Sequence, residues 1–262
     1  MRRVSIILFA LYLSLLTTHA MAQQSYGVLF YNVENLFDTT DDPATDDQDM
    51  HPLSDKRWNE VRYKHKLSDI AKVIGEFAQQ HDFPALIGLA EVENRGVLTR
   101  LLRSTLLRKL DYSIVHHDSG DRRGIDVAIL YRRSSMNLES FSVMTPEYEG
   151  QKLATRDILH ARMCLADSCR MDFIVNHHPS KYGGEKESEG RRGAAMTALK
   201  ELCDSLGSGN IIAMGDFNDT PDADSFEIIE GTLVNKGNPL HERGEGTIRY
   251  EGKWDLIDMF MV

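Results

Sequence analysis

Four short apolar runs in this sequence each end in a cluster of polar residues, and this pattern restricts the fold more than any other feature. The runs GVLFY, ALIGLA, MDFIV and NIIAMG lead into Asn32-Val33-Glu34-Asn35, Glu91-Val92-Glu93-Asn94, Asn176-His177-His178 and Asp216-Phe217-Asn218-Asp219. Nearly unbroken, β-rich runs of this length are typical of strands covered on both faces. The carboxyl ends of such strands are where α/β proteins assemble their sites. We therefore expect the four polar clusters to contribute to one site.

Helical periodicity separates some of these runs. Apolar residues recur at three- and four-residue steps over residues 58–78, and similar stretches cover about 95–107 and 187–206. In the middle of the chain, YSIVHH, GIDVAILYRR, LESFSVM, DILHARMCL and CRMDFIVNHH predict successive strands with turns between them. Because strands outnumber helices and some neighbours are hairpins, the sequence predicts an α/β protein with mixed sheets.

The first 22 residues differ from the rest of the chain. Arg2 and Arg3 precede an apolar run, and Ala20-Met21-Ala22 has the small-x-small pattern of a signal-peptidase site. The apolar run is shorter than the ~20 residues that a membrane span needs, which disfavours an uncleaved anchor. We therefore expect residues 1–22 to be a signal peptide, the protein to be periplasmic or secreted, and residues 23–262 to form one domain without a linker or repeat.

The charge balance and the cysteines narrow the possibilities further. A net charge of −10 argues against binding nucleic acid through overall charge, although it does not exclude a nuclease whose site is locally cationic. Cys164 and Cys169 flank a short turn between two predicted strands, where an exported protein could hold either a disulfide or two thiols. Cys203 falls in a helical pattern and is expected to be a buried thiol.

The polar clusters have the composition of a metal site. Glu91 directly follows an apolar strand, and a carboxylate at the rim of a core is costly unless it is paired or bound to a cation. Glu, Asp and Asn oxygens without thiolates suit Mg²⁺, with Mn²⁺ as an alternative, better than zinc. A histidine on a neighbouring strand could contact a phosphate oxygen or protonate a leaving group.

Six motifs in a fixed order carry a family resemblance. YNVENLFD, GLAEVEN, GIDVAILY, NHHPSK, GDFND and WDLID resemble the endonuclease/exonuclease/phosphatase superfamily, which includes deoxyribonucleases and apurinic endonucleases. The resemblance implies a four-layer α/β sandwich, in which two mixed β-sheets lie face to face and are flanked by helices. It also implies hydrolysis of phosphate esters with a divalent metal.

The resemblance assigns roles to individual residues. Glu91 matches the principal metal carboxylate, and Asn32 and Glu34 match a polar pair near metal and phosphate. The residues that match the catalytic positions are His177 at the scissile phosphate, Asp216 at the attacking water, Asn218 holding phosphate and Asp216, and Asp258 as the partner of a catalytic histidine. The histidine alignment could slip by one position to His178.

Several basic residues follow or precede these motifs. Lys181 and Arg192 come after the His177 cluster and are expected to reach substrate phosphates, whereas Arg122 and Arg123 precede a strand on a glycine-bounded turn. Solvation at the surface is the competing explanation for each of them.

The family closes with a strand that ends in an Asp-His pair, which this sequence lacks after Asp258. We therefore expect a domain that is incomplete at its C-terminus, with an exposed apolar edge over residues 257–262. Loss of such a base or charge stabiliser is expected to lower the rate about 10²–10⁴-fold.

Three functions remain open. The leading hypothesis is an exported, monomeric, Mg²⁺-dependent phosphodiesterase that acts as a nuclease on DNA or RNA. The second keeps the metal site but makes the substrate a small or lipid phosphate ester. The third is a protein that retains the fold and has impaired or no catalysis.

Overall fold

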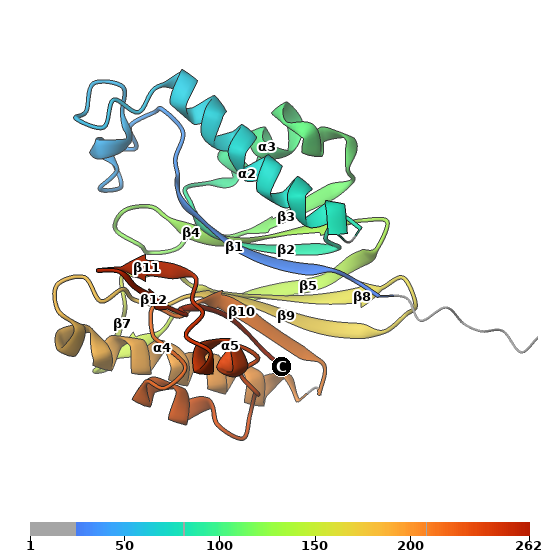
Figure 1. Cartoon of the computed structure of the whole chain (residues 1–262), viewed down its shortest axis with the longest axis vertical. Coiled ribbons are helices and arrows are strands. Elements are labelled where there is room, and N and C mark those ends of the chain that lie inside the picture. Colours follow the sequence, from blue (N-terminus) through green and yellow to red (C-terminus); the bar gives the residue numbers. More distant parts are fainter. Residues whose placement is uncertain (1–24, 81, 208) are drawn as a thin grey trace, which may run out of the picture.

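The computed structural model describes residues 25–80, 82–207 and 209–262. Two β-sheets lie face to face, and helices cover the outer face of each sheet (Figure 1). The predicted four-layer α/β sandwich is therefore confirmed. The predicted signal peptide, residues 1–22, lies outside the described residues.

The first sheet is built from the N-terminal half of the chain. Its strand order is β1-β2-β4-β3, with β1 and β2 parallel and the other neighbours antiparallel. The strands are β1 (Val28–Leu36), β2 (Leu86–Val92), β3 (Tyr112–His116) and β4 (Asp126–Arg132). The mixture of parallel and antiparallel pairs agrees with the sequence prediction.

The second sheet is built from the C-terminal half. Its strand order is β13-β10-β9-β8-β5, and only β9 and β10 are parallel among the neighbours. The strands are β5 (Met136–Met144), β8 (Ile158–Leu165), β9 (Arg170–His177), β10 (Ile211–Asp216) and β13 (Asp258–Met261). Two small hairpins lie outside both sheets, formed by β6 (Glu147–Tyr148) with β7 (Gln151–Lys152) and by β11 (Ile248–Tyr250) with β12 (Lys253–Asp255).

Helices cover the outer faces where the periodic stretches predicted them. The α-helices are α2 (Glu60–Gln80), α3 (Arg95–Ser104), α4 (Glu185–Leu206) and the short α5 (Asn238–Glu242). The 3-10 segments are η1 (Gln48–Met50), η2 (Leu106–Lys109) and η3 (Asp224–Ile229). Figure 1 shows α2 and α3 over the first sheet and α4 over the second. Among the described residues, no helix has the length and apolar character needed to cross a bilayer.

The alternation of side chains along each strand creates three apolar layers. On β2, Leu86 and Ala90 belong to the cluster between the sheets, whereas Ile87 and Leu89 belong to the cluster beneath α2 and α3. Strands of the second sheet alternate in the same way between the central layer and the layer beneath α4. Burial on both faces explains why these strands are continuous apolar runs in the sequence.

The C-terminal strand is not the exposed apolar edge that the sequence predicts. One side of β13 pairs with β10, and its other side exchanges backbone hydrogen bonds with Val234 and Lys236. Within this strand Met259 and Met261 are buried, at 2% and 0% exposure. The prediction was wrong because the segment around Val234 covers the free edge of β13. This segment has no strand-like pattern of apolar residues in the sequence, so its pairing could not be foreseen.

All three cysteines are free thiols, and Cys203 is buried as expected. The turn between β8 and β9 pairs Cys164 with Arg170, which leaves Cys169 just beyond the ladder. The structure therefore does not form the Cys164–Cys169 disulfide that the sequence left open.

Candidate active site

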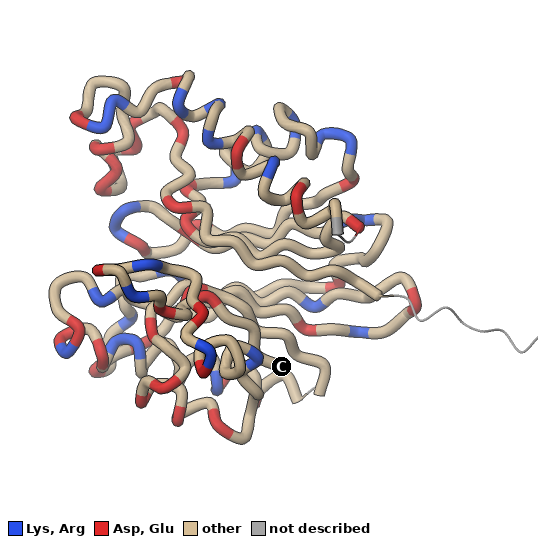
Figure 2. The backbone as a smooth tube through the Cα atoms, viewed as in Figure 1, with Lys and Arg blue, Asp and Glu red and all other residues tan. Residues whose placement is uncertain are grey.

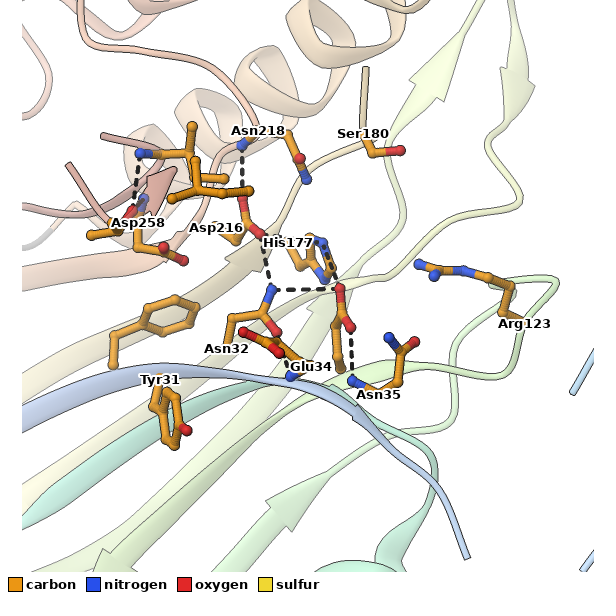
Figure 3. A pocket seen from close by; sticks show the side chains of 15 residues that line it. Tyr31, Asn32, Glu34, Asn35, Arg123, His177, Ser180, Asp216, Asn218 and Asp258 are labelled. Carbon is orange, nitrogen blue, oxygen red and sulfur yellow. Dashed lines mark hydrogen bonds and ion pairs between the residues drawn. The ribbon is translucent and has the colours of Figure 1, made fainter. Parts of the chain in front are cut away.

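Polar residues from five strands meet at one end of the sandwich. Asn32 lies opposite Ala90 in the β1–β2 ladder, which places the first two polar clusters side by side. In the second sheet Asp216 lies between His177 on β9 and Asp258 on β13. Residues from both sheets line one open cleft of about 600 Å³ (Figure 3). The predicted convergence of the four clusters is present in the fold.

The backbone turns sharply where the first sheet reaches the cleft. Glu34, Asn35 and Glu91 have φ values of 54°, 62° and 63°, in the left-handed region that few residues other than glycine adopt. The β1–β2 ladder is irregular over the same residues. Such an irregularity redirects a side chain that regular alternation would send to one face of the sheet. Glu91 thereby lines the cleft.

Hydrogen bonds join the two sheets across the cleft. The Asn32 amide donates from Nδ2 to Asp216 Oδ2 at 3.0 Å and to Glu91 Oε1 at 3.5 Å. Glu91 also accepts the Asn35 backbone N–H through Oε2 at 2.8 Å. The side-chain Oδ1 of Asn32 accepts the Glu34 backbone N–H at 2.9 Å. One asparagine therefore fixes the spacing between carboxylates that belong to different sheets.

Asp216 lies in a strongly desolvated position. The residue is 4% exposed, and its Oδ1 accepts the Asn218 backbone N–H at 2.9 Å. Burial, followed by the negative charge of Asp258, raises the pKa of Asp216 to about 7, while the bonds from Asn218 and Asn32 oppose the shift. A carboxyl with such a pKa can exchange a proton near neutral pH.

His177 lies beside both carboxylates. Its Nε2 is 3.7 Å from Asp216 Oδ2 and 4.0 Å from Glu91 Oε1. Burial holds the pKa of His177 well below its usual value, and the cations Arg156 and Arg123 add to this effect. The imidazole is therefore neutral at pH 7 in the absence of a bound anion or acid.

The neighbouring histidine occupies a different environment. The His178 ring contacts Phe217 edge-on, with ring centroids 4.9 Å apart, and burial lowers the pKa of His178 to about 3. Its backbone carbonyl accepts hydrogen bonds from Asn218 Nδ2 at 3.0 Å and from Arg156 at 2.5 Å. Of the two histidines only His177 lines the cleft, so the geometry favours the unshifted alignment.

The carboxylates in the cleft fit a divalent cation. Asp258 Oδ1 is buried and has no hydrogen-bond partner in the described part of the chain. Burial and the nearby charge of Glu91 both raise the pKa of Asp258. Grouped carboxylates that repel one another in this way need a positive charge between them. The Asn32 amide and the exposed Glu34 also line the cleft, so apart from the His177 imidazole the potential metal ligands offer oxygen, which suits Mg²⁺ or Mn²⁺.

Arg192 has a different place from the one that the sequence predicts. The residue is 2% exposed, and its guanidinium donates to Asp219 Oδ2 at 2.8 Å, to Ser188 Oγ at 2.5 Å and to the Glu185 carbonyl at 3.2 Å. Its donors are thus engaged inside the protein, and it does not line the cleft. Arg192 anchors the turn after β10 and is not positioned to bind substrate phosphate.

Lys181 also lies outside the set of residues that line the cleft. Its Nζ pairs with Glu185 and lies 3.4 Å from Asp219 Oδ1. The predicted contact of Lys181 with phosphate is therefore not supported by its position.

Arg123 is the cation that the structure brings to the cleft. Its side chain is 48% exposed, and Figure 3 shows it extending toward the other cleft residues. The glycine-bounded turn marked it in the sequence as one of several basic candidates.

Arg156 was missed, although its buried guanidinium pairs with Asp121 at 3.2 Å behind the cleft. A single arginine entering an apolar run, as in TRDILH, is the signal that could have found it.

Two mixed β-sheets lie face to face, and carboxylates converge at their strand ends. This arrangement defines the class of the protein as an α/β sandwich of the phosphohydrolase type. The endonuclease/exonuclease/phosphatase family model matches residues 27–262, and the chain belongs to this family. The resemblance found in the sequence is thereby confirmed. Members of the family are phosphodiesterases and phosphatases that generally depend on a divalent metal.

Solved structures share this fold at low sequence identity. A Bacteroides thetaiotaomicron endonuclease/exonuclease/phosphatase family protein is 18% identical with a TM-score of 0.61, covering 91% of this chain and 83% of its own. The mannosyl-6-phosphatase Bt3783 of the same species is 17% identical with a TM-score of 0.59, covering 90% and 85%. A humanised D. rerio TDP2 is 14% identical with a TM-score of 0.54, covering 90% and 81%. No curated protein matches the sequence significantly.

Proposed function

We propose that this protein is a divalent-metal-dependent phosphodiesterase and that its substrate is DNA or RNA. The observation that carries the proposal is the convergence of Asn32, Glu91, His177 and Asp216 from two sheets on one open cleft. A volume of about 600 Å³ falls in the range of small-ligand sites and suits a phosphate with its flanking groups.

The metal would lie among the oxygens at the end of the first sheet. Glu91 would be its principal ligand, and Asn32, Asp258 and Glu34, which also line the cleft, would be its further ligands. When bound, Mg²⁺ or Mn²⁺ supplies positive charge that neutralises the phosphate and polarises the phosphorus centre.

Asp216 orients the attacking water and takes its proton. The Asn218 backbone N–H and the Asn32 amide hold the two oxygens of Asp216, so the carboxylate cannot rotate away from the cleft. The Asn218 side chain is itself fixed because its Nδ2 donates to the His178 carbonyl. Asn218 therefore positions Asp216. Contact of Asn218 with the substrate phosphate, which the sequence also predicts, is its second proposed role.

His177 contributes a neutral donor. The side chain is 3% exposed, and its Nε2 points to the space between Asp216 and Glu91. A neutral imidazole that carries its proton on Nε2 donates to an oxygen of the scissile phosphate without adding a charge. Arg123, on the opposite side of the cleft, supplies the positive charge that binds the phosphate.

Export and a monomeric state belong to the same proposal. Export is supported by the basic start, apolar run and Ala20-Met21-Ala22 pattern of the sequence. A monomer is consistent with a cleft to which residues of one chain contribute both the acidic groups and the phosphate-binding cation.

A second candidate function is hydrolysis of a small phosphate ester. Among the described residues that line the cleft, Arg123 is the sole lysine or arginine. A groove for a nucleic-acid strand usually carries a series of cations along the backbone path. One cation suits recognition of one phosphate, and a mannosyl-6-phosphatase is among the proteins that share the fold.

The test compares substrates under one set of conditions. Purified protein is assayed with Mg²⁺ or Mn²⁺ on single-stranded DNA, RNA, bis-nitrophenyl phosphate, a hexose 6-phosphate and a phospholipid head-group ester. We expect cleavage of a nucleic acid and of the nitrophenyl diester, and loss of cleavage in Glu91→Gln. Glu189→Gln, an exposed carboxylate on α4, serves as the matched control.

Two results decide between the candidates. Turnover of the hexose phosphate with intact DNA and RNA would replace the nuclease by the second function. If every substrate stays intact with both ions, the proposal of phosphoester hydrolysis is wrong.

A further inference from the structure

A second cluster of metal-binding side chains lies outside the candidate active site. His116 ends β3, Asp126 begins β4, and Asp118 lies in the loop that connects these strands. One potential ligand atom from each of the three residues lies within 4.8 Å of the others. None of them lines the active-site cleft. The cluster therefore contributes no side chain to the proposed hydrolysis.

Two buried members of the cluster, His116 and Asp126, are spaced like two ligands of one metal ion. His116 Nε2 lies 3.2 Å from Asp126 Oδ2, and both side chains are almost fully buried, at 2% and 4% exposure. Two donors bound at about 2.0–2.1 Å with tetrahedral angles lie roughly 3.3 Å apart. Although the two atoms are close, His116 Nε2 makes no hydrogen bond of acceptable geometry within the described residues. A buried nitrogen that lies this close to a carboxylate without a hydrogen bond lacks a partner, and a cation between the two would supply one.

The remaining ligands are available without rearranging the fold. Asp126 Oδ1 is held by the Ser119 backbone N–H at 2.8 Å, which leaves Oδ2 directed at His116. Asp118 Oδ1 lies 3.8 Å from His116 Nδ1, and its side chain is 83% exposed, so a change of rotamer can bring it to the ion. Water would fill a fourth position.

We propose that His116, Asp118 and Asp126 form a binding site for a transition-metal cation of the Zn²⁺ type. An imidazole with two carboxylates is a ligand set that favours Zn²⁺ over Mg²⁺. The active-site cleft, whose ligands are oxygens, has the opposite preference. The two sites therefore differ in the metal that they select.

The position of the cluster gives the site a consequence for the cleft. An ion held by His116 and Asp126 joins the two ends of the loop 117–125. This loop carries Arg123, which lines the cleft, and Asp121, which pairs with the buried Arg156. Zn²⁺ at this position fixes the base of the loop that presents the phosphate-binding cation.

The experiment measures metal binding and does not depend on catalysis. In a Glu91→Gln background, which weakens the active-site metal position, Zn²⁺ affinity and stoichiometry are measured by competition with a chromophoric chelator. We expect one Zn²⁺ per chain, with binding lost in His116→Gln and weakened at least tenfold in Asp118→Asn. His117→Gln is the matched control, because this neighbouring histidine pairs with Asp157 at 3.4 Å and does not belong to the cluster.

Thermal unfolding provides a second readout. At one fixed Zn²⁺ concentration the ion should raise the melting temperature of the Glu91→Gln protein and of His117→Gln, and raise that of Asp118→Asn by less, because a ligand stabilises the folded state that binds it. Asp118 is exposed, so its substitution tests the site even if His116→Gln does not fold. The proposal is overturned if no Zn²⁺ binds in the Glu91→Gln background. It is also overturned if Zn²⁺ binds with the same affinity after Asp118→Asn. The ion would then be bound elsewhere, and His116 and its neighbours would form an ordinary ion pair.

Discussion

The two sheets contribute to the active site in different ways. The first sheet presents Glu91, whose side chain is 15% exposed, from irregular backbone in the left-handed region. The second sheet presents Asp216 and His177 from a regular ladder, with their side chains 6% and 3% exposed. One sheet thus offers an accessible ligand, and the other offers groups held in a low-dielectric setting. In the proposed mechanism, therefore, the principal metal ligand comes from the N-terminal half of the chain, and the proton acceptor comes from the C-terminal half.

Exchanging one carboxylate from each half should separate these roles most clearly. Glu91→Gln and Asp216→Asn should each lower kcat/KM about 10²–10⁴-fold, the usual range for losing such a group. Raising the Mn²⁺ concentration should restore part of the activity of Glu91→Gln, which has lost a ligand, and none of that of Asp216→Asn, which has lost a proton acceptor. Steady-state kinetics at several metal concentrations measure this difference. An identical metal response in the two variants would contradict the division of roles.

Adding one methyl group to each half tests how tightly each sheet is constrained. An ideal Cβ on Gly215 would lie 2.3 Å from the Asn176 carbonyl oxygen, so Gly215→Ala must open the β9–β10 ladder. On Gly88 the Cβ would meet the flexible Met214 side chain and Val175 at 3.0 Å, between the sheets. We expect losses of about 3 kcal/mol and about 1 kcal/mol in the free energy of unfolding, respectively. Urea denaturation measures both, and equal losses would show that the sheets tolerate crowding equally.

The buried carboxyl of the second sheet should make stability depend on pH. Because the pKa of Asp216 is about 7 in the folded protein and about 3.9 when unfolded, the folded state binds more protons between these values. The metal-free protein should therefore lose stability as pH rises from about 4 to about 7, by up to about 4 kcal/mol at about 1.36 kcal/mol per pKa unit. Urea denaturation with a chelator present measures this dependence. Asp216→Asn should flatten it, and an unchanged slope in that variant would exclude Asp216 as the cause.

The smallest effect is expected at the rim of the first sheet. Arg123→Ala should raise KM about tenfold and leave kcat within a factor of about three, because a charged hydrogen bond to phosphate is lost before the chemical step. Arg122→Ala is the control: this neighbour is 78% exposed, pairs with Asp46 and lies outside the cleft. Should both variants behave alike, Arg123 has no specific role.

Sequence patterns predict the fold and most of the acidic cleft because both depend on local features. Strands that are buried on both faces appear as unbroken apolar runs, and the polar residue that follows a run must lie at the strand end. Glu91, Asp216 and Asn32 could be placed together by this reasoning with the family resemblance. The sequence predicted mixed sheets but not the order of the strands, which the structure supplies.

The basic residues could not be predicted because their positions depend on distant partners. Arg192 and Arg123 look equally suitable in the sequence, but Asp219 lies close enough to Arg192 to bind it inside the protein. Arg123 has only a 4.0 Å contact with Asp121 and remains available. The cover over β13 was missed for the same reason, because Val234 belongs to an irregular segment.

The division of the sheets along the chain has a further consequence for the timing of folding. Every strand of the first sheet lies within residues 28–132 and every strand of the second within 136–261. During synthesis the N-terminal half emerges before the strands of the second sheet are available. The bond from Asn32 to Asp216 forms only when the second half has docked. The nascent chain therefore has no complete site, and a hydrolase built in this way stays inert until its last strands are in place.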